Sequence, residues 1–113
     1  MTFLRACAVA DVLEGTALPT VVDGLDVAIV HTEGQFYAIF DECSHAAVAL
    51  SEGEVDGCHI ECYMHGSRFD LRTGYPDALP ATEPVPVYPV AIDNGDVYVD
   101  LDHPYDPEAT EEN

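Results

Sequence analysis

Residues 25–40 read LDVAIVHTEGQFYAIF, two apolar runs separated by a glycine-containing turn. The runs Leu25 to Thr32 and Gln35 to Phe40 are rich in β-branched and aromatic residues with the two-residue alternation of a strand. Glu33-Gly34 lies between them, and glycine tolerates the positive φ of a tight turn. The stretch therefore predicts a β-hairpin, and the rest of the chain follows the same pattern.

Similar short runs flank this hairpin on both sides. They predict further strands at Thr2 to Ala8, Ala17 to Val22, His59 to Glu61, Arg68 to Leu71, Val87 to Ile92 and Asp96 to Leu101. Turn residues separate them: Val22-Asp23-Gly24 precedes the strand that starts at residue 25, and Asn94-Gly95 suits a tight hairpin. No window longer than about eight residues has helical periodicity. The predicted fold class is all-β with antiparallel strands.

Residues from about 41 to 84 interrupt the strand pattern with two Cys/His clusters, several glycines and several prolines. We expect an inserted subdomain there, and its low apolar content suits stabilisation by a bound metal centre. The prolines that lead into the last hairpin restrict strand pairing to an edge or an irregular segment, and they are Pro80, Pro84, Pro86 and Pro89. Residues 1–101 are expected to form one domain, and 102–113 a flexible acidic tail.

The charge balance excludes two classes of partner. The 113 residues include 22 acidic and 3 basic residues, all arginine, for a formal net charge of -19. Such a charge repels phosphate backbones and anionic membranes, so we expect no nucleic-acid and no membrane partner. It favours a basic docking surface on a protein partner, and it is also typical of halophilic proteins in a salt-rich cytoplasm.

The four cysteines raise the question of redox compartment. Ala6 to Ala10, the longest apolar run near a terminus, is far shorter than the roughly 20 residues of a membrane helix. No basic segment of a secretion signal precedes it. We therefore expect a cytoplasmic protein with reduced thiols, in which metal binding is favoured over disulfides.

Two short motifs carry the chemistry: Cys43-Ser44-His45 and, after residues 46–61, Cys62-Tyr63-Met64-His65-Gly66. Each motif offers one thiolate and one imidazole. Two thiolates and two imidazoles suit either a tetrahedral zinc ion or a two-iron cluster with cysteines on one iron and histidines on the other. The spacing alone does not separate these two metal centres.

Further residues separate the two kinds of metal centre, because the sequence resembles the Rieske ferredoxin family over nearly its whole length. The matching residues are Cys43-x-His45, Cys62-x-x-His65-Gly66-x-x-Phe69-Asp70, Leu71-Arg72-Thr73-Gly74 and Val87-Tyr88-Pro89-Val90. The resemblance implies one [2Fe–2S] cluster, with Cys43 and Cys62 on an inner iron and His45 and His65 on an outer iron near the surface. It also implies a basal antiparallel β sandwich or barrel, with the cluster-binding subdomain at its tip and a third loop at about 75–84.

The resemblance also bears on the reduction potential. High-potential members of the family have an extra cysteine in each ligand loop, which form a disulfide, and a serine and a tyrosine that donate hydrogen bonds to the cluster. In this chain Val48 and Met64 occupy the cysteine positions, Phe69 the tyrosine position and Ser67 the serine position. Fewer donors stabilise the reduced cluster less, so we predict a potential near the bottom of the range of about −150 to +300 mV.

Gly66 and Ser67 are the residues expected to contact the cluster without ligating it. Gly66 follows a predicted ligand and would allow close backbone approach, and backbone N–H groups in both loops can donate to the cluster sulfurs. Ser67 is the side chain expected to tune the potential.

The function that the resemblance implies is that of a soluble, monomeric ferredoxin without catalytic residues. It would carry single electrons from a flavin-dependent NAD(P)H reductase to a terminal oxygenase or dioxygenase. Three alternatives remain at this point: a small subunit of a nitrite-reductase-type complex, an accessory protein of iron–sulfur cluster biogenesis, and a structural zinc module.

The remaining cysteines and cations are assigned to structural roles. Cys7 is expected in the core, and Cys58 and His59 outside the ligand set. Arg68 and Arg72 are expected to form ion pairs with nearby acids. The histidines expected to be structural or exposed are His31 and His103.

Overall fold

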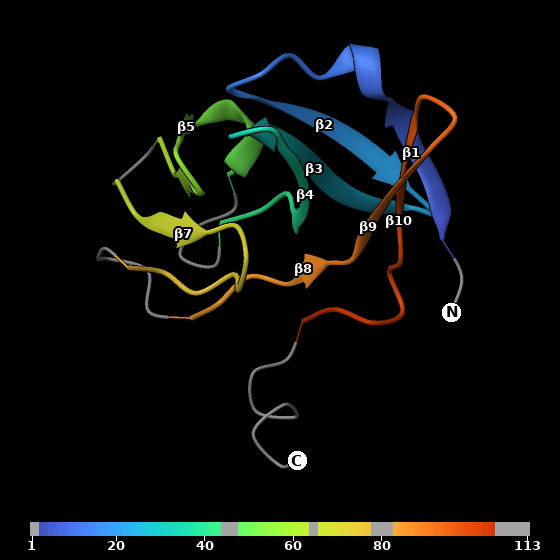
Figure 1. Ribbon diagram of the computed structural model, residues 1–113. Coiled ribbons are helices and arrows are strands. Elements are labelled where there is room, and N and C mark those ends of the chain that lie inside the picture. The colour runs from blue at the N-terminus through green and yellow to red at the C-terminus, as the bar shows by residue number, and fades with distance from the viewer. Residues whose placement is uncertain (1–2, 44–47, 64–65, 78–82, 106–113) are drawn as a thin grey trace, which may run out of the picture.

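The computed structural model describes residues 3–43, 48–63, 66–77 and 83–105. Within these ranges the chain forms ten β-strands and two 3₁₀ helices of one turn each (Figure 1). The strands are β1 (Leu4–Ala8), β2 (Thr16–Val22), β3 (Leu25–Thr32), β4 (Gln35–Phe40), β5 (Glu54–Asp56), β6 (His59–Glu61), β7 (Arg68–Asp70), β8 (Val87–Tyr88), β9 (Val90–Asp93) and β10 (Asp96–Val99). The 3₁₀ helices are η1 (Val9–Asp11) and η2 (Leu50–Glu52).

The strands form three antiparallel sheets. We call β1-β10-β9 the basal sheet, β2-β3-β4-β8 the central sheet and β5-β6-β7 the site sheet. The site sheet and the basal sheet lie at opposite ends of the molecule (Figure 1). The predicted all-β, antiparallel fold class is confirmed.

Three hairpin turns fix the register of the longer strands. Each has two consecutive residues at positive φ, as in the type I′ turns that match the twist of paired strands. The pairs are Asp23 and Gly24 at 51° and 81°, Glu33 and Gly34 at 54° and 75°, and Asn94 and Gly95 at 51° and 82°. The turn positions predicted from sequence are therefore confirmed.

The central sheet separates two cores because successive side chains of a strand point to opposite faces. In β3, Val27 and Ile29 pack toward the basal sheet, whereas Ala28 and Val30 pack toward the site sheet. The basal core consists of Cys7, Val12, Val22, Val27, Ile29, Ala38, Tyr88, Val97 and Val99. The site core consists of Ala28, Val30, Ile39, Cys43, Leu50, Ile60, Cys62, Phe69, Leu71, Val85 and Val87.

Most predicted strands are present, and the differences have local causes. The predicted strand from Val87 to Ile92 is divided at Pro89, so that β8 pairs with β4 while β9 pairs with β10. Proline has no N–H for a continuous ladder, and the chain changes sheet there. Strand β5 was not predicted, because Glu-Val-Asp contains a single apolar residue. The predicted first strand starts at Thr2, which lies outside the described residues.

The last described segment returns to the central sheet. The N–H of Tyr105 donates to the carbonyl of Val87 at 2.7 Å, and the ring of His103 is 2.8 Å from the buried carboxylate of Asp100. Residues 106–113, which include most of the predicted tail, lie outside the described residues. None of the described helices has the length and apolar character to cross a membrane.

Candidate functional site

The first predicted ligand segment leaves the central sheet at the end of β4. Cys43 follows shortly after and is 4% exposed in the site core. Its N–H donates to the carbonyl of Val48 at 2.9 Å, which closes a loop around residues 44–47. Those residues include the predicted ligand His45 and lie outside the described part of the chain. The described contacts thus fix both ends of the segment.

The second predicted ligand segment has a similar closure between β6 and β7. Cys62 is 2% exposed, its N–H donates to the carbonyl of Ser67 at 2.7 Å, and its own carbonyl accepts from the N–H of Gly66 at 3.0 Å. Gly66 has φ 79°, a left-handed value that favours glycine. An added Cβ on Gly66 would meet only the Glu61 carboxylate among the described atoms, so backbone conformation accounts for this glycine. Residues 64–65, which include the predicted ligand His65, lie outside the described residues.

A third segment lies beside the first. The N–H of Val85 donates to the carbonyl of Gly74 at 2.8 Å, which joins the two residues on either side of the predicted third loop. Gly74 has φ 82°, and a Cβ there would collide with the Val85 carbonyl, so only glycine fits. A surface cavity of about 260 Å³ has Cys43 on one side and Pro84 to Pro86 on another. The Pro-rich stretch and the first ligand segment are therefore neighbours, while residues 78–82 lie outside the described chain.

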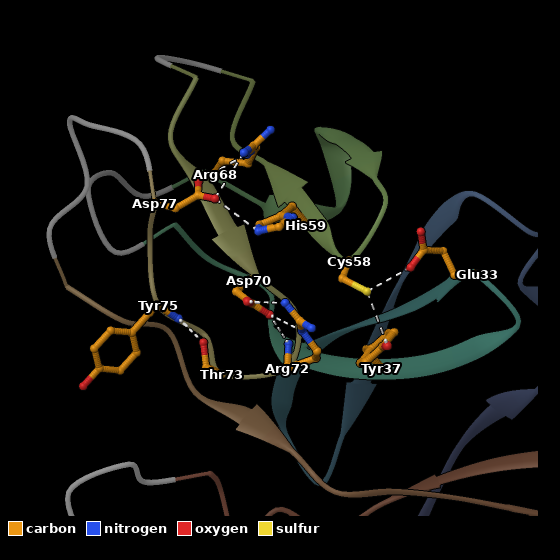
Figure 2. A network of polar contacts seen from close by, with 10 residues as sticks. All are labelled: Glu33, Tyr37, Cys58, His59, Arg68, Asp70, Arg72, Thr73, Tyr75 and Asp77. Carbon is orange, nitrogen blue, oxygen red and sulfur yellow. Dashed lines mark hydrogen bonds and ion pairs between the residues drawn. The ribbon is translucent and has the colours of Figure 1, made fainter.

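A polar network ties the third segment to the site sheet (Figure 2). Arg68, at the start of β7, donates to both carboxylate oxygens of Asp77 at 3.2 Å, and its other terminal nitrogen is 3.6 Å from Asp56. His59 of β6 lies 3.1 Å from the same Asp77 carboxylate. The hydrogen bond from Arg68 lowers the pKa of the Asp77 carboxyl group. Asp77 therefore links two strands to the segment that follows Gly74.

Arg72 makes a second bidentate pair in the same region (Figure 2). Its guanidinium donates to the two carboxylate oxygens of Asp70 at 3.1 and 2.9 Å, and these bonds lower the pKa of Asp70. The backbone N–H of Arg72 also donates to Asp70 at 2.8 Å. The predicted pairing of Arg68 and Arg72 with nearby acids is confirmed.

The other cysteines and the described histidines have contacts of their own. Cys58 donates to the carboxylate of Glu33 at 3.0 Å and lies 3.8 Å from the Tyr37 hydroxyl, and the bond to Glu33 raises the pKa of the thiol (Figure 2). Cys7 is 6% exposed in the basal core, as predicted, and burial raises the pKa of its thiol. His31 stacks on Phe36 with ring centroids 4.1 Å apart.

The donor set of the described residues fits a buried thiolate-bound centre. Cys43 and Cys62 come from separate segments, yet both belong to the site core. Soft thiolates in an apolar, water-poor pocket are suitable ligands for iron, and each cysteine sits in a loop whose sequence also supplies one histidine. The residues present therefore fit a centre that takes one thiolate and one imidazole from each loop.

Ser67 and Phe69 lie near the candidate ligands Cys43 and Cys62. Both are fully buried, and Phe69 packs in the site core with the two cysteines. Val48 packs against the same core. Three of the residues invoked for the reduction potential therefore lie around the candidate centre, while Met64 lies outside the described residues.

Sequence reasoning missed three polar residues that hold the site together: Asp41, Ser51 and Asp77. Asp41 accepts two hydrogen bonds from Ser51, and Asp77 accepts those from Arg68. Spacing from Cys43 could have drawn attention to Asp41, since it lies two residues before a predicted ligand. Nothing in the sequence pairs Asp77 with Arg68 rather than with another of the chain's few cations.

Comparisons with known proteins agree with this geometry. Residues 2–89 match the family model of the Rieske [2Fe-2S] domain. The 3-phenylpropionate/cinnamic acid dioxygenase ferredoxin subunit of Escherichia coli K12 is 43% identical over 102 residues, which cover 89% of this chain and 95% of that protein.

Two solved structures extend the likeness to the fold. The ferredoxin of carbazole 1,9a-dioxygenase from Nocardioides aromaticivorans IC177 has a TM-score of 0.83 and 37% identity, covering 88% of this chain and 97% of that one. A ferredoxin chain from a complex of reduced oxygenase and oxidized ferredoxin in carbazole 1,9a-dioxygenase has a TM-score of 0.78 and 40% identity, covering 86% and 91%. The predicted resemblance and the predicted cofactor, one Rieske-type [2Fe–2S] cluster, are confirmed. This chain belongs to the Rieske [2Fe–2S] domain family.

Proposed function

We propose that this chain is the ferredoxin of an oxygenase system, which accepts one electron from a flavin-dependent NAD(P)H reductase and delivers it to a terminal oxygenase or dioxygenase. Its cluster ligands are Cys43, His45, Cys62 and His65. The observation that carries the proposal is the burial of Cys43 and Cys62 in one apolar core, each at the edge of a closed loop that contains one histidine.

The relatives support an electron carrier rather than an enzyme. The curated relative from E. coli is a ferredoxin subunit of a dioxygenase, and one solved relative is a ferredoxin in complex with its oxygenase. These findings confirm the predicted electron-transfer role and support an oxygenase as the acceptor. They favour a ferredoxin over a nitrite reductase subunit, a biogenesis factor or a zinc module.

The residues of this chain contribute burial, orientation and fixed charge to the site. A Rieske cluster supplies a reversible one-electron couple when it is bound. Around it, the site core keeps water from the cysteine ligands, and the backbone bonds at Val48 and Ser67 fix the entry and exit of each loop. The site sheet and the Arg68–Asp77 pair keep the third segment in place beside them.

A low potential follows from the side chains around the ligands. Phe69 is a fully buried ring without a hydroxyl group. Val48, which occupies the position of a disulfide cysteine in the high-potential members, packs against the site core and cannot form a disulfide. The missing hydroxyl group leaves the reduced cluster with one donor fewer, and the missing disulfide is a second difference from the high-potential members. Ser67 is the side chain that we assign as a donor to the cluster region, whereas the N–H of Gly66 is bonded to the carbonyl of Cys62. A Phe69→Tyr variant should therefore have a more positive midpoint potential.

The docking partners should present basic surfaces. Glu42 is exposed and precedes Cys43, and Glu61, half-buried, precedes Cys62, so an acidic residue adjoins each ligand cysteine. Opposite fields speed the encounter of two proteins without tightening the complex greatly, which suits a carrier that must leave after transfer. The cytoplasmic location, the monomeric state, and the boundaries at residues 41–84 and 102–113 stay predictions.

The deciding experiment is metal and sulfide analysis combined with EPR and potentiometry. The expected result is two irons and two sulfides per chain, a rhombic signal after reduction, and a midpoint potential in the lower half of the Rieske range. One zinc ion without sulfide would contradict the proposed function. A signal with the average g value of an all-cysteine cluster would contradict the ligands His45 and His65.

A second experiment tests the acceptor and the charge. Electron transfer from the reduced protein to a dioxygenase of the family should be fast at low ionic strength and should slow as salt screens the acidic surface. Transfer rates that do not respond to ionic strength would contradict a basic docking surface and leave the electron-transfer role intact.

A further inference from the structure

The carboxylate of Asp41 lies buried at the base of the first ligand segment. Asp41 follows the last residue of β4 and precedes Cys43 by two positions. It is 8% exposed, whereas most acidic residues of the described chain lie at or near the surface. A buried carboxylate costs free energy unless its oxygens find partners, so its contacts indicate what it holds.

Both carboxylate oxygens accept hydrogen bonds from one residue. Oδ1 accepts from the backbone N–H of Ser51 at 2.7 Å, and Oδ2 accepts from the Ser51 hydroxyl at 2.7 Å. The N–H of Asp41 itself donates to the carbonyl of Asp26 in β3 at 3.0 Å. Asp41 therefore joins the central sheet to η2 at the point where the first ligand segment begins.

Two contacts, one outside the other along the chain, close the first ligand segment. The outer closure joins Asp41 to Ser51, and the inner one joins the N–H of Cys43 to the carbonyl of Val48. Leu50, which precedes Ser51, is fully buried in the same core as Cys43. Short hydrogen bonds to a carboxylate are among the stronger ones, so the outer closure fixes where Cys43 enters the core.

The charge of Asp41 has no cationic side chain beside it in the described part of the chain. The ion pairs of Arg5, Arg68 and Arg72 go to other aspartates. Water and salt screen a buried charge less than an exposed one. A carboxylate in this place opposes the arrival of a further negative charge on a neighbouring centre.

We propose that Asp41 is a positioning residue for the ligand Cys43, and that its carboxylate lowers the midpoint potential of the cluster. This inference rests on the proposed function, because it requires Cys43 to ligate the cluster. It adds a fixed charge to the missing hydroxyl group at Phe69 and the missing disulfide cysteine at Val48 as causes of a low potential. It also gives Ser51 a role, as the residue that holds the carboxylate in place.

Four variants separate charge from positioning. Asp41→Asn keeps the size of the side chain and an acceptor oxygen for the Ser51 N–H but removes the charge. Asp23→Asn removes the same charge in an exposed turn, where asparagine tolerates the φ of 51°. Ser51→Ala removes the hydroxyl bond and keeps the charge, and Ser51→Thr restores the hydroxyl.

The charge is tested by potentiometry of the cluster-loaded protein at one pH and one ionic strength. Asp41→Asn should make reduction more favourable by about three- to tenfold, the upper value being about 59 mV for a one-electron couple. Asp23→Asn should leave the potential close to that of the wild type. Equal shifts in the two variants would overturn the assignment of the charge effect to Asp41.

Positioning is tested by the rate at which a chelator removes the cluster. Ser51→Ala should lose its visible absorption several-fold faster than the wild type, and Ser51→Thr should return to the wild-type rate. Equal rates in all three proteins would overturn the positioning role. A wild-type protein without the mixed-ligand EPR signal would instead overturn the proposed function, so the two failures are distinguishable.

Discussion

The basal core and the site core lie on opposite faces of the same central sheet, yet they are built differently. The basal core takes most of its side chains from strands of four to eight residues in the basal and central sheets. The site core takes many from three-residue strands and from connecting segments, and it includes Cys43 and Cys62. Long paired strands stabilise themselves, whereas short strands and loops need additional links.

Charge is distributed with the same asymmetry. Two of the three arginines, Arg68 and Arg72, form bidentate pairs with aspartates in the site region. The third, Arg5, makes a single bond to Asp96 in the basal sheet. The comparison suggests that the basal region depends on apolar burial, and that the site region depends on the cluster and on polar links.

Removal of a proposed cluster ligand should have the largest effect and should destabilise the site region far more than the basal region. Cys62→Ala is expected to abolish cluster binding, because the iron loses a thiolate. Cys43, the other cysteine of the site core, is already assigned as a ligand and cannot replace it. Iron and sulfide content should fall to background. Hydrogen exchange should then show lost protection in β5 to β7 and retained protection in β2 to β4, because the two regions open separately.

Two other cysteines provide matched controls for this prediction. Cys7→Ala removes a thiol from the basal core, and Cys58→Ala removes one that contacts Glu33 and Tyr37. Both variants should keep full iron and sulfide. Loss of the cluster in Cys58→Ala would show that the ligand set is wrong.

Core truncations should have the next largest effect and should separate the two regions. Ile29 and Ile60 are both fully buried, in the basal core and the site core respectively. Each Ile→Ala change should cost about 2–5 kcal/mol locally. Ile29→Ala should lower the free energy of global unfolding in urea. Ile60→Ala should mainly speed cluster loss and exchange in the site sheet.

One result for Ile29→Ala and Ile60→Ala would contradict this division into two regions. If Ile29→Ala released the cluster as fast as Ile60→Ala, the two cores would unfold as one cooperative unit. The distinction between a self-sufficient basal region and a dependent site region would then be wrong.

The same contrast explains what the sequence could predict. The strands of the central sheet were predicted with the right bounds at Leu25–Thr32 and Gln35–Phe40, because long runs with a buried face carry a strong pattern. Strand β5 was not predicted, because its formation depends on pairing with β6 and not on its own composition. The change of sheet at Pro89 depends on tertiary packing, which a run of apolar residues does not report.

The candidate site shows a similar division. The candidate ligand cysteines could be proposed from sequence because metal chemistry restricts residue type and spacing, and both are buried in one core. The link from Asp41 to Ser51 could not, since hydrogen-bond partners ten residues apart have no fixed spacing rule. Arg68 was expected to pair with an acid, but the choice of Asp77 required the folded third segment.

Acid should weaken the site region through the Arg72–Asp70 pair. The hydrogen bond from Arg72 lowers the folded-state pKa of Asp70 below the unfolded value of about 3.9. A lowered carboxyl pKa contributes stability above the unfolded pKa and loses it as pH falls through the folded pKa. The pair should therefore support the site region at pH 6 and progressively less below about pH 4.

Arg72→Gln tests this pH dependence against Arg5→Gln, which removes the ion pair between Arg5 and Asp96 in the basal sheet. The Arg72 variant should lose its cluster faster than the wild type at pH 6, and the difference should shrink as the pH approaches 3. Arg5→Gln should leave the rate of cluster loss near that of the wild type at both pH values. A constant difference across the range would contradict the role of Asp70.

Salt should have the smallest effect, and it tests whether like charges are tolerated differently in the two regions. In the site sheet Glu54 lies directly opposite Glu61, and in the basal sheet Asp93 lies directly opposite Asp96. Like charges in directly opposed positions cost a few tenths of a kcal/mol to about 1 kcal/mol at low salt.

Glu54→Gln and Asp93→Asn each relieve one of these pairs. Glu54→Gln should slow cluster loss at low ionic strength, and the gain should vanish near 1 M salt, where the screening length is about 3 Å. Asp93→Asn should raise the urea midpoint of the whole protein at low salt without changing cluster loss, because its pair lies on the basal sheet. If both variants slowed cluster loss equally, repulsion between acidic residues would act on the whole molecule rather than on each region separately. If neither variant responded to salt, these two pairs would give no support to the hypothesis of salt adaptation.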